Sequence, residues 1–411
     1  MLLIKKVLFV ALFLLLITGF LDVHAVDIDF SRNEFSKCFE LIVDDEGDGD
    51  YRSIQKAIDN VDSGGIISVF SGVYHECVKI SKPLSIRGVA CELGDGDDSG
   101  VPIIDGGGRK DVVVVDSECC VFSGFKVVDS GLKYSAGCGI KILCDDCKIS
   151  GNIVKNCFVG IDAGDVSCCQ ISENVLYYNV FGINLGRTID CRIYNNSLYN
   201  SGLTIVSDVE DVVKNIFSNN TVNGRPLFLF LRVNDTVISD VDVGQLILVD
   251  CHNITLEKLE ISNTTIGVEI AESSNITVRN CVFSDIHRGG ISFHGENFEV
   301  YNVSFKNCSY GCYLEAGSNG FYIHHNNFID VYKHDQAVIS WVKKHQTFVE
   351  SKNIVFDSNY YSDWIGLKVK ILGFLPKFIP GYPNYFCKTL NICPVFKFDF
   401  NPSLKPYNIT L

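Results

Sequence analysis

Two pairs of cysteines in the first half of the chain have side chains that can bind metal ions. Cys144 and Cys147 are separated by two aspartates, and Cys168 and Cys169 follow later in the chain. Cysteine thiolates near carboxylates can bind zinc or copper, but only the first pair has the spacing of a metal-binding motif. Buried thiols that pack as small apolar groups, or that form disulfides, are the alternative that we favour.

Histidines concentrate in the second half of the chain. Six of the nine are His287, His294, His324, His325, His334 and His345. If the fold gathers them, they could hold a metal ion or supply a general base. His334 with the adjacent Asp335 is the pair to test first. Separate surface histidines in polar turns are the simpler interpretation.

Acidic residues supply the other candidates for catalysis. Cleavage of a glycosidic bond needs two carboxyl groups about 5 to 9.5 Å apart across the bond. The sequence does not fix this distance. The candidate catalytic residues are therefore Asp145, Asp146, Asp162, His334 and Asp335.

A repeat of 22 residues determines which elements would position these side chains. The segments that begin at Cys147, Cys169 and Cys191 all have the pattern Cys-x-Ile-x-x-Asn. A fixed period of this length indicates a stacked repeat architecture. Apolar and polar residues alternate within each segment, which predicts short strands. Because one repeat cannot bury its own apolar face, the repeats must stack as coils whose parallel strands pair about 4.8 Å apart.

The sixth position of the repeat recurs along most of the chain, and its residues are Phe125, Asn152, Asn174, Asn196, Asn220, Val241, Leu259, Cys281, Val303, Asn326 and Asn359. This series predicts an all-β fold of about 11 to 13 coils. The recurring asparagines are expected to form a ladder of hydrogen bonds from coil to coil. The first position carries cysteine in some repeats and residues such as Ile254 and Phe298 in others, so we expect it to lie in the core.

A strip of polar residues is expected to face outward, because polar and apolar residues alternate after the glycine of each repeat. These residues are Lys141, Asp162, Asn184, Thr204, Glu269, Ser292 and Tyr313. Their hydroxyl, amide and charged groups suit the hydroxyls of a carbohydrate. A solvated face is the commoner meaning of such a strip.

The N-terminal residues 1–25 have the form of a secretory signal peptide. Lys5 and Lys6 precede an apolar run from Val7 to Phe20, and Ala25 ends a stretch that fits a cleavage site. An uncleaved anchor is the alternative, and no later stretch reaches the about 20 apolar residues of a spanning helix. We therefore expect a protein that is secreted or displayed at the cell surface.

Three regions are expected after the signal peptide: an N-terminal cap with the first coil in residues 26–90, the repeats in residues 91–362, and a C-terminal cap in residues 363–411. Apolar spacing predicts a short cap helix within Tyr51–Val61. Six of the nine prolines follow residue 375. Proline cannot donate to a strand ladder, so the coils must end before them.

Export would permit disulfides and glycosylation. Cys387 and Cys393 are the first disulfide candidates, and Cys308 with Cys312 is a weaker second pair. The candidate glycosylation sites are Asn195, Asn219, Asn234, Asn253, Asn263, Asn275, Asn302, Asn307 and Asn408. The net charge of -14 provides no basic face, so we expect no nucleic-acid partner.

Motifs near the N-terminus resemble a known family. They are Asp50-Tyr-x-Ser-Ile-Gln-x-Ala-Ile-Asp59, Gly72-Val-Tyr-x-Glu-x-Val-x-Ile80 and Lys82-Pro-Leu-Ser-Ile-x-Gly88. They are similar to the opening of pectate-lyase-like proteins, and most of all to the NosD-like branch of carbohydrate-binding and sugar-hydrolysis repeats, common on archaeal and bacterial surfaces. Asn359-Tyr360 with Asp363-Trp364 resembles an ending seen in that branch. The resemblance implies a single-stranded, right-handed parallel β-helix.

The resemblance also implies where function would lie, because β-helix enzymes that act on carbohydrates bind substrate on an outward strip. Asp145-Asp146 matches the Asp-Asp pair of polygalacturonase-like enzymes, but their Gly-His-Gly and Arg-Ile-Lys motifs are absent. Calcium-dependent pectate lyases stack carboxylates on one strip with an arginine nearby. Asp162, Asp165 and Arg187 are the nearest residues here, without a matching motif, so the resemblance makes Ca²⁺ a candidate cofactor. We therefore expect an exported cell-surface protein that binds carbohydrate or is structural, without catalysis, and whose partner is an extracellular glycan or the cell envelope. A polysaccharide lyase or glycoside hydrolase is the second hypothesis, and NosD-like copper handling is the third.

Overall fold

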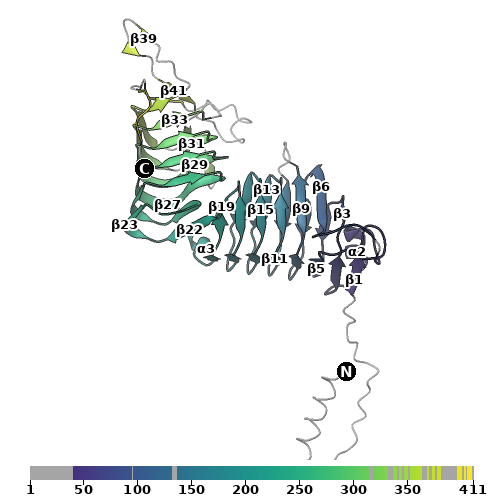
Figure 1. Cartoon of the computed structure of the whole chain (residues 1–411). Coiled ribbons are helices and arrows are strands. Elements are labelled where there is room, and N and C mark those ends of the chain that lie inside the picture. Colours follow the sequence, from purple (N-terminus) through teal and green to yellow (C-terminus); the bar gives the residue numbers. More distant parts are fainter. Residues whose placement is uncertain are drawn as a thin grey trace, which may run out of the picture. The chain divides into compact units, whose positions relative to one another are not determined.

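The protein forms a parallel β-solenoid of about 13 turns with little helix (Figure 1). The computed structural model describes residues 40–411 except 95, 132–136, 315–317, 332–336, 340–341, 345–346, 350–351, 363–367, 370–372, 375–376, 381–395, 400–401, 404 and 410–411. The predicted all-β parallel β-helix is confirmed.

The coils of residues 40–222, here called the first stack, each contribute short strands to three parallel sheets. The first sheet contains β1 (Glu40–Val43), β2 (Ile66–Val69), β5 (Ser85–Gly88), β8 (Val121–Ser123), β11 (Lys148–Ser150), β14 (Gln170–Ser172), β17 (Arg192–Tyr194) and β20 (Ile216–Ser218). The second contains β4 (Val78–Ile80), β7 (Val113–Val115), β10 (Cys138–Ile142), β13 (Val159–Gly164), β16 (Phe181–Gly186) and β19 (Leu203–Val206). The third contains β3 (Val73–Tyr74), β6 (Ile103–Arg109), β9 (Lys126–Ser130), β12 (Ile153–Lys155), β15 (Val175–Tyr177), β18 (Ser197–Tyr199) and β21 (Thr221–Val222).

Residues 225–361, here called the second stack, continue the coil with longer strands. One series of paired strands is β22 (Arg225–Leu231), β24 (Gln245–Val249), β27 (Ile266–Arg279), β29 (Gly289–Tyr301), β31 (Tyr310–Leu314) and β34 (Ala337–Ile339). Another is β23 (Asn234–Ser239), β25 (His252–Glu257), then β27 and β29, β32 (Asn319–His324) and β37 (Lys352–Asp357). The remaining sheet is β26 (Glu260–Ser262), β28 (Val282–Ser284), β30 (Ser304–Lys306), β33 (Asn327–Ile329) and β38 (Tyr360–Tyr361).

A few short elements complete the described fold. Three antiparallel pairs are among them: β35 (Val342–Lys344) with β36 (Thr347–Val349), β39 (Lys368–Val369) with β40 (Gly373–Phe374), and β41 (Lys377–Pro380) with β42 (Phe396–Asp399). The helices are α2 (Ile54–Asn60) and α3 (Val209–Val212). Among the described residues, none of the helices has the length and apolarity needed to cross a membrane.

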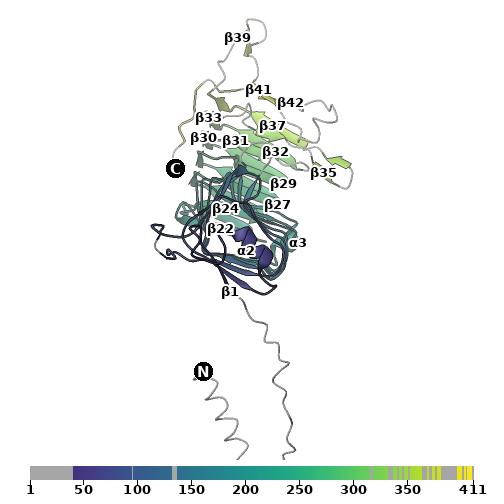
Figure 2. The same cartoon turned by 90° about the vertical axis from the view of Figure 1, so that its right-hand side faces the viewer.

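Helix α2 lies over the N-terminal end of the first stack (Figure 2). Ile54, Ala57 and Ile58 are fully buried, because their spacing places them on one face of the helix. The carboxylate of Glu76 accepts the N–H group of Ile54 at 2.7 Å, which satisfies a free donor of the first turn. The predicted cap helix is therefore present.

Asparagines form the predicted ladder inside the first stack. Asn152, Asn174, Asn196 and Asn220 are all buried. The side-chain oxygen of Asn174 accepts the backbone N–H and the side-chain Nδ2 of Asn152, at 3.0 and 3.1 Å. Its own Nδ2 donates to the carbonyl of Ile149 at 3.0 Å. Each amide thus pairs with backbone groups of its own stack and with the next amide, which satisfies polar atoms that water cannot reach.

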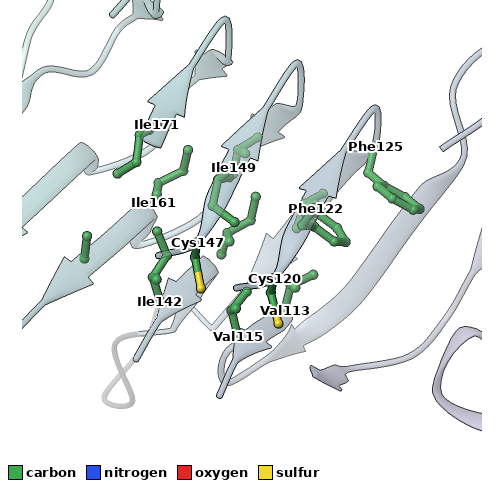
Figure 3. Packing of buried hydrophobic residues seen from close by; sticks show 14 of the residues in the cluster. Val113, Val115, Cys120, Phe122, Phe125, Ile142, Cys147, Ile149, Ile161 and Ile171 are labelled. Carbon is green, nitrogen blue, oxygen red and sulfur yellow. The ribbon is translucent and has the colours of Figure 1, made fainter. Parts of the chain in front are cut away.

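The cysteines at the first position of the repeat stack beside this ladder. Cys120, Cys147, Cys169 and Cys191 are at most 1% exposed. Figure 3 shows Cys120 and Cys147 among the aliphatic side chains of neighbouring strands. Their inward position is the one predicted from the apolar residues at the same place in other repeats.

All fifteen described cysteines are free thiols. The proposed disulfide between Cys308 and Cys312 is therefore wrong. Both of these thiols are fully buried in the core of the second stack, where they fill space between apolar side chains. Cys387 and Cys393 lie outside the described residues.

The second stack has its own core, which contains a line of stacked aromatic rings. Phe283, Phe305, Phe328 and Tyr361 stack in line, with ring centroids 5.5, 5.1 and 5.3 Å apart. The sixth position carries Leu259, Cys281 and Val303 here, and the asparagine ladder resumes only at Asn326 and Asn359. That ladder ends on Asp399, whose carboxylate accepts the N–H group of Asn359 at 3.0 Å.

The chain changes from one stack to the other at a tight hairpin. Asn223 and Gly224 both have positive φ, and the flanking strands β21 and β22 pair antiparallel. Asn-Gly is the dipeptide best suited to a two-residue hairpin. Ile247 and Val249, on β24, then pack into the core of the first stack. The outward face of the second stack thus covers the last coil of the first.

Several predicted features lie outside the described residues. They are the signal segment 1–25 with its cleavage site, the pair His334 and Asp335, and the cap disulfide. The boundaries of the two caps therefore remain predictions.

Candidate functional site

The predicted outward residues form two columns of aligned residues on successive strands. The first column is Lys141, Asp162, Asn184 and Thr204, and the second is Glu269, Ser292 and Tyr313. In each column the strands pair in parallel register, so side chains that are one repeat apart lie side by side. The periodicity of the sequence identified both columns correctly.

The two columns approach each other where the stacks meet, and three of their members are buried there. Thr204, Glu269 and Ser292 are 3%, 8% and 2% exposed. The carboxylate of Glu269 accepts the N–H group of Ile205 at 3.2 Å. The expectation that these three residues face solvent is therefore wrong, because the second stack packs its outward face against the end of the first.

Polar contacts fix the residues of the strip that remain partly exposed, which are Lys141, Asp162, Asn184 and Tyr313. Nδ2 of Asn184 donates to the carboxylate of Asp162 at 2.7 Å. The hydroxyl of Thr204 donates to the side-chain oxygen of Asn184 at 2.9 Å. Lys141 lies 3.7 Å from the carboxylate of Asp111. These contacts hold the side chains in place before any ligand arrives, which lowers the entropy cost of binding.

Arg288 connects the two stacks at this place. The centre of its guanidinium lies 5.4 Å from the ring of Phe181 on β16 and 4.8 Å from the ring of Tyr313 on β31. A guanidinium over aromatic faces is attracted by their negative charge distribution. Phe158 and Tyr310 widen the aromatic area, with ring centroids 5.6 Å from Phe181 and 5.8 Å from Tyr313.

We call Asp162, Phe181, Asn184, Arg288 and Tyr313 the junction surface, and all five residues are partly exposed. The surface combines aromatic rings with a planar cation, an amide and a carboxylate. The cation has five N–H donors, and the amide and the carboxylate supply acceptors. Such a set can pack against the apolar face of a sugar ring while pairing with its hydroxyls.

The other candidate carboxylates have structural partners. Asp145 and Asp146 lie in the turn before β11, away from the strand that carries Asp162. The carboxylate of Asp145 accepts the N–H group of Ser167 at 2.7 Å, so it connects two successive turns. Asp146 has a φ of 56°, a conformation that aspartate tolerates in turns. The fold therefore does not place this pair with Asp162 on one strand.

The calcium-binding set expected on the strip is not assembled either. Asp165 forms an exposed ion pair with Arg187 at 2.6 Å. Among the described residues, every group of three or more potential ligands with closely spaced donor atoms lies between Asp44 and Asp98. No such group contains Asp162 or Asp165.

The four cysteines proposed as metal ligands are likewise kept apart from a common site. Cys147 and Cys169 lie in the core, whereas Cys168 is exposed in a turn and Cys144 is half-buried. Within the described part of the chain, no group of three potential ligands includes a cysteine. The metal hypothesis for these residues is therefore not supported by their geometry.

The described histidines pair locally and do not gather into one cluster. His287 contacts the backbone oxygen of Asn200 at 3.1 Å, and His294 lies 3.4 Å from the carboxylate of Glu272. Only His324 and His325 are in contact with each other, at 2.9 Å between their Nδ1 atoms. The described histidines therefore do not form one cluster, although His324 lies in strand β32 and not in a polar turn as the simpler interpretation expected.

Phe181 and Arg288 were missed by the sequence analysis. Phe181 and Tyr310 stand immediately before a repeat glycine, and that position could have been recognised as a second outward site of the repeat. Arg288 lies two residues before the repeat glycine Gly290, because Gly289 aligns with Tyr310. Which of these residues meet depends on which coils are in contact at the junction, and the pattern within one repeat carries no such information.

Two family models match different parts of the chain. Residues 109–226 match the model described as "Periplasmic copper-binding protein (NosD)", and residues 230–328 match the model described as "Right handed beta helix region". The resemblance predicted from the sequence is confirmed. The NosD segment ends at Pro226, close to the hairpin that separates the two stacks, and the β-helix region begins in β22. Among curated protein sequences, none matches this chain.

Solved structures of several other β-helix proteins are similar to this chain at low sequence identity. An alginate lyase from Paenibacillus sp. str. FPU-7 is 14% identical over 66% of this chain and 91% of its own, with a TM-score of 0.30. The A-module of the mannuronan C-5 epimerase AlgE6 from Azotobacter vinelandii is 15% identical over 75% and 81%, with a TM-score of 0.35. The receptor-binding domain of the siphovirus 9NA tailspike is 10% identical over 82% and 79%, with a TM-score of 0.34.

Proposed function

We propose that this protein is an exported cell-surface protein that binds an extracellular glycan through the junction surface and does not cleave it. The observation that carries the proposal is the position of Arg288 over the rings of Phe181 and Tyr313. These three residues come from separate coils of the two stacks. Their contact gives the surface a defined arrangement before it meets a ligand.

Sugars have two kinds of surface, and the junction surface offers a partner for each. The C–H groups on one face of a sugar ring form an apolar patch, which suits the exposed rings of Phe181 and Tyr313. The hydroxyls at the ring edge can donate to Asp162 and accept from Arg288. A sugar carboxylate, as in uronic acids, would suit the guanidinium even better, since that pair is charge-assisted.

The proposal excludes hydrolysis because the junction surface has a single partly exposed carboxylate. Hydrolysis of a glycosidic bond requires two carboxyl groups on either side of the bond. Asp162 is already hydrogen-bonded to Asn184. Glu269, the other acidic residue of the two columns, is 8% exposed and accepts a backbone hydrogen bond from Ile205.

Export is supported by the N-terminal segment of the sequence and by asparagines on the surface. Residues 1–25 have the form of a signal peptide. Eight of the nine candidate glycosylation sites are exposed, and the ninth, Asn302, is half-buried. Seven of them adopt positive φ, five between strands and two, Asn253 and Asn275, within strands β25 and β27.

A glycan array with the purified full chain tests the proposal. Binding to at least one oligosaccharide is expected, and Arg288→Ala and Tyr313→Ala should each weaken it at least about tenfold, which corresponds to the loss of one well-placed contact. Tyr313→Phe retains the ring and should lose less. Arg187→Ala is the matched control, because it removes an exposed arginine whose partner is Asp165.

Three results would contradict the proposal. One is the absence of binding across neutral and uronic-acid glycans. Another is equal binding by wild type, Arg288→Ala and Tyr313→Ala, all with an unchanged melting temperature. The third is release of reducing ends or unsaturated uronides from a bound polysaccharide, which would favour the lyase or hydrolase hypothesis.

A further inference from the structure

Two acidic loops near the N-terminal end of the first stack come together, away from the junction surface. One oxygen from each of Asp44, Glu46 and Glu92 lies within 4.8 Å of the others, and Asp45, Glu46 and Asp98 form a second group of the same kind. The loops are in close contact. The backbone of Gly94 in one loop approaches the carboxylate of Asp48 in the other so closely that a Cβ atom added to Gly94 would be 1.9 Å from a carboxylate oxygen.

Asp44 shows that this cluster is more than an acidic surface. Its side chain is fully buried, and Oδ2 accepts the N–H groups of Gly47 and Asp48 at 2.9 and 3.0 Å. Oδ1 has no hydrogen-bond partner, and the same is true of one buried oxygen on each of Asp45 and Glu92. A buried carboxylate oxygen without a partner is costly, so native proteins rarely keep one unless a ligand or an ion satisfies it.

The charges of the cluster are also uncompensated. In the described part of the chain, none of its five carboxylates forms an ion pair with lysine, arginine or histidine. Arg52, whose side chain lies against Gly47, is the neighbouring cation.

We propose that these two loops bind Ca²⁺, with Glu46 shared between the two groups of carboxylates. All the side-chain ligands offered are oxygens, which hard cations prefer. Calcium takes six to eight oxygens in irregular geometry, whereas magnesium requires a nearly ideal octahedron and keeps several waters. A site made from two loops with shared carboxylates therefore suits calcium better.

Calcium bound here would fasten the loop of residues 44–50 to the loop that contains Glu92 and Asp98. The first loop directly follows strand β1, and Asp45 also accepts the N–H group of Val73, at the start of β3. The ion would thus hold together the elements that close the open end of the first stack. This role is separate from glycan binding and does not depend on it.

The test uses the purified full chain, first stripped with EDTA and then titrated with calcium chloride by isothermal calorimetry. We expect a dissociation constant below about 1 mM, as in extracellular calcium modules. We also expect millimolar calcium to raise the melting temperature by at least about 2 °C. Magnesium alone should give a smaller rise.

Glu46→Gln is the decisive variant, because Glu46 is exposed and belongs to both groups. It should fold normally and lose calcium binding at least about tenfold. Asp44→Asn should do the same while keeping an oxygen for the N–H groups of Gly47 and Asp48. Asp97→Asn, an exposed neighbour outside both groups, is the matched control and should bind like wild type.

The proposal is overturned if wild type shows no calcium-dependent heat and no rise in melting temperature. It is also overturned if Glu46→Gln and Asp44→Asn bind calcium as tightly as Asp97→Asn, because the ions would then be held elsewhere on the acidic surface. If Asp44→Asn fails to fold, the comparison of Glu46→Gln with Asp97→Asn decides alone.

Discussion

The two stacks wind similar coils around different interiors. In the first stack the turn between two sheets is held by buried amides, and the adjacent core positions are filled by thiols and aliphatic side chains. In the middle of the second stack the same turn has Leu259, Cys281 and Val303, and a line of stacked aromatic rings fills the core. Strand pairing from coil to coil is parallel in both.

The difference shows which parts of the coil require a particular side chain and which tolerate several. Backbone pairing between coils does not depend on side chains, so either interior is compatible with it. An amide ladder is specific, because each member must both donate and accept at fixed positions. A row of rings is more tolerant, since apolar packing has little directional preference. Substitutions at matched positions of the two stacks should separate these two kinds of stability.

The largest effect is expected from Asn174→Leu in the first stack. Leucine cannot accept from Asn152 or donate to Ile149, so several buried polar groups lose their partners. We expect the free energy of unfolding of this stack to fall by about 3 to 5 kcal/mol. Urea unfolding combined with hydrogen exchange of peptides from each stack would measure it. A loss below about 1 kcal/mol would mean that the ladder contributes little.

High pH should weaken the second stack through its isolated thiols. Desolvation by burial raises the pKa of Cys281 and of Cys308 to about 12, from a value of 9.0 in the unfolded chain. Their contribution to stability is therefore complete below pH 9 and is lost as the pH rises from 9 to 12, because only the unfolded chain releases the protons. Each thiol should reduce the stability by about 1 kcal/mol per pH unit in that range.

Cys281→Val provides the control for this pH dependence, because Val303 occupies the equivalent position one coil later. Urea midpoints measured between pH 8 and 11 should fall less steeply for the variant than for wild type. If the midpoints of the variant and of wild type fall with the same slope between pH 8 and 11, the loss of stability does not come from a proton that Cys281 releases only in the unfolded chain.

A smaller effect is expected from Phe305→Leu in the second stack. Phe305 is fully buried and stacks between Phe283 and Phe328, but leucine retains most of its apolar area. We expect a loss of about 1 to 2 kcal/mol, compared with about 3 to 5 kcal/mol for Phe305→Ala. The same replacement residue would thus cost more at Asn174 than at Phe305. The reverse order in the same unfolding assay would contradict the contrast between the two interiors.

The smallest effect is expected at an ion pair between coils on the surface. Arg187 and Asp165 are one repeat apart and 2.6 Å from each other, and about two-thirds of each side chain is exposed. Because water and salt screen such a pair, Arg187→Ala should change the free energy of unfolding by less than about 1 kcal/mol. A larger loss, measured at 0.15 M salt, would indicate that surface pairs help to align the coils.

Much of the coil could be predicted from the sequence, because the repeat is regular where the coils are regular. The series Asn152, Asn174 and Asn196 located the ladder, and the alternation around Asp162 and Asn184 located the outward columns. The alternation also assigned Thr204, Glu269 and Ser292 to the outward side. It could not show that another part of the chain covers them, since burial depends on contacts between distant coils.

The disulfide proposed between Cys308 and Cys312 failed for a related reason. Cysteines four residues apart are compatible with a disulfide around a small loop. In the fold, however, both side chains occupy separate core positions of the second stack, where apolar neighbours surround them. Spacing in sequence did not reveal that environment.

The sequence by itself determined the parallel β-helix, its cap helix and the inward and outward sides of each strand, because these follow from periodic side-chain patterns that each repeat carries. Only the tertiary structure decided where the first stack ends against the second, and hence that Arg288 contacts Phe181 and Tyr313. It also decided that Asp44 and Glu92 face each other in the cap. These contacts join residues that are far apart in the chain, and no local pattern encodes such distances.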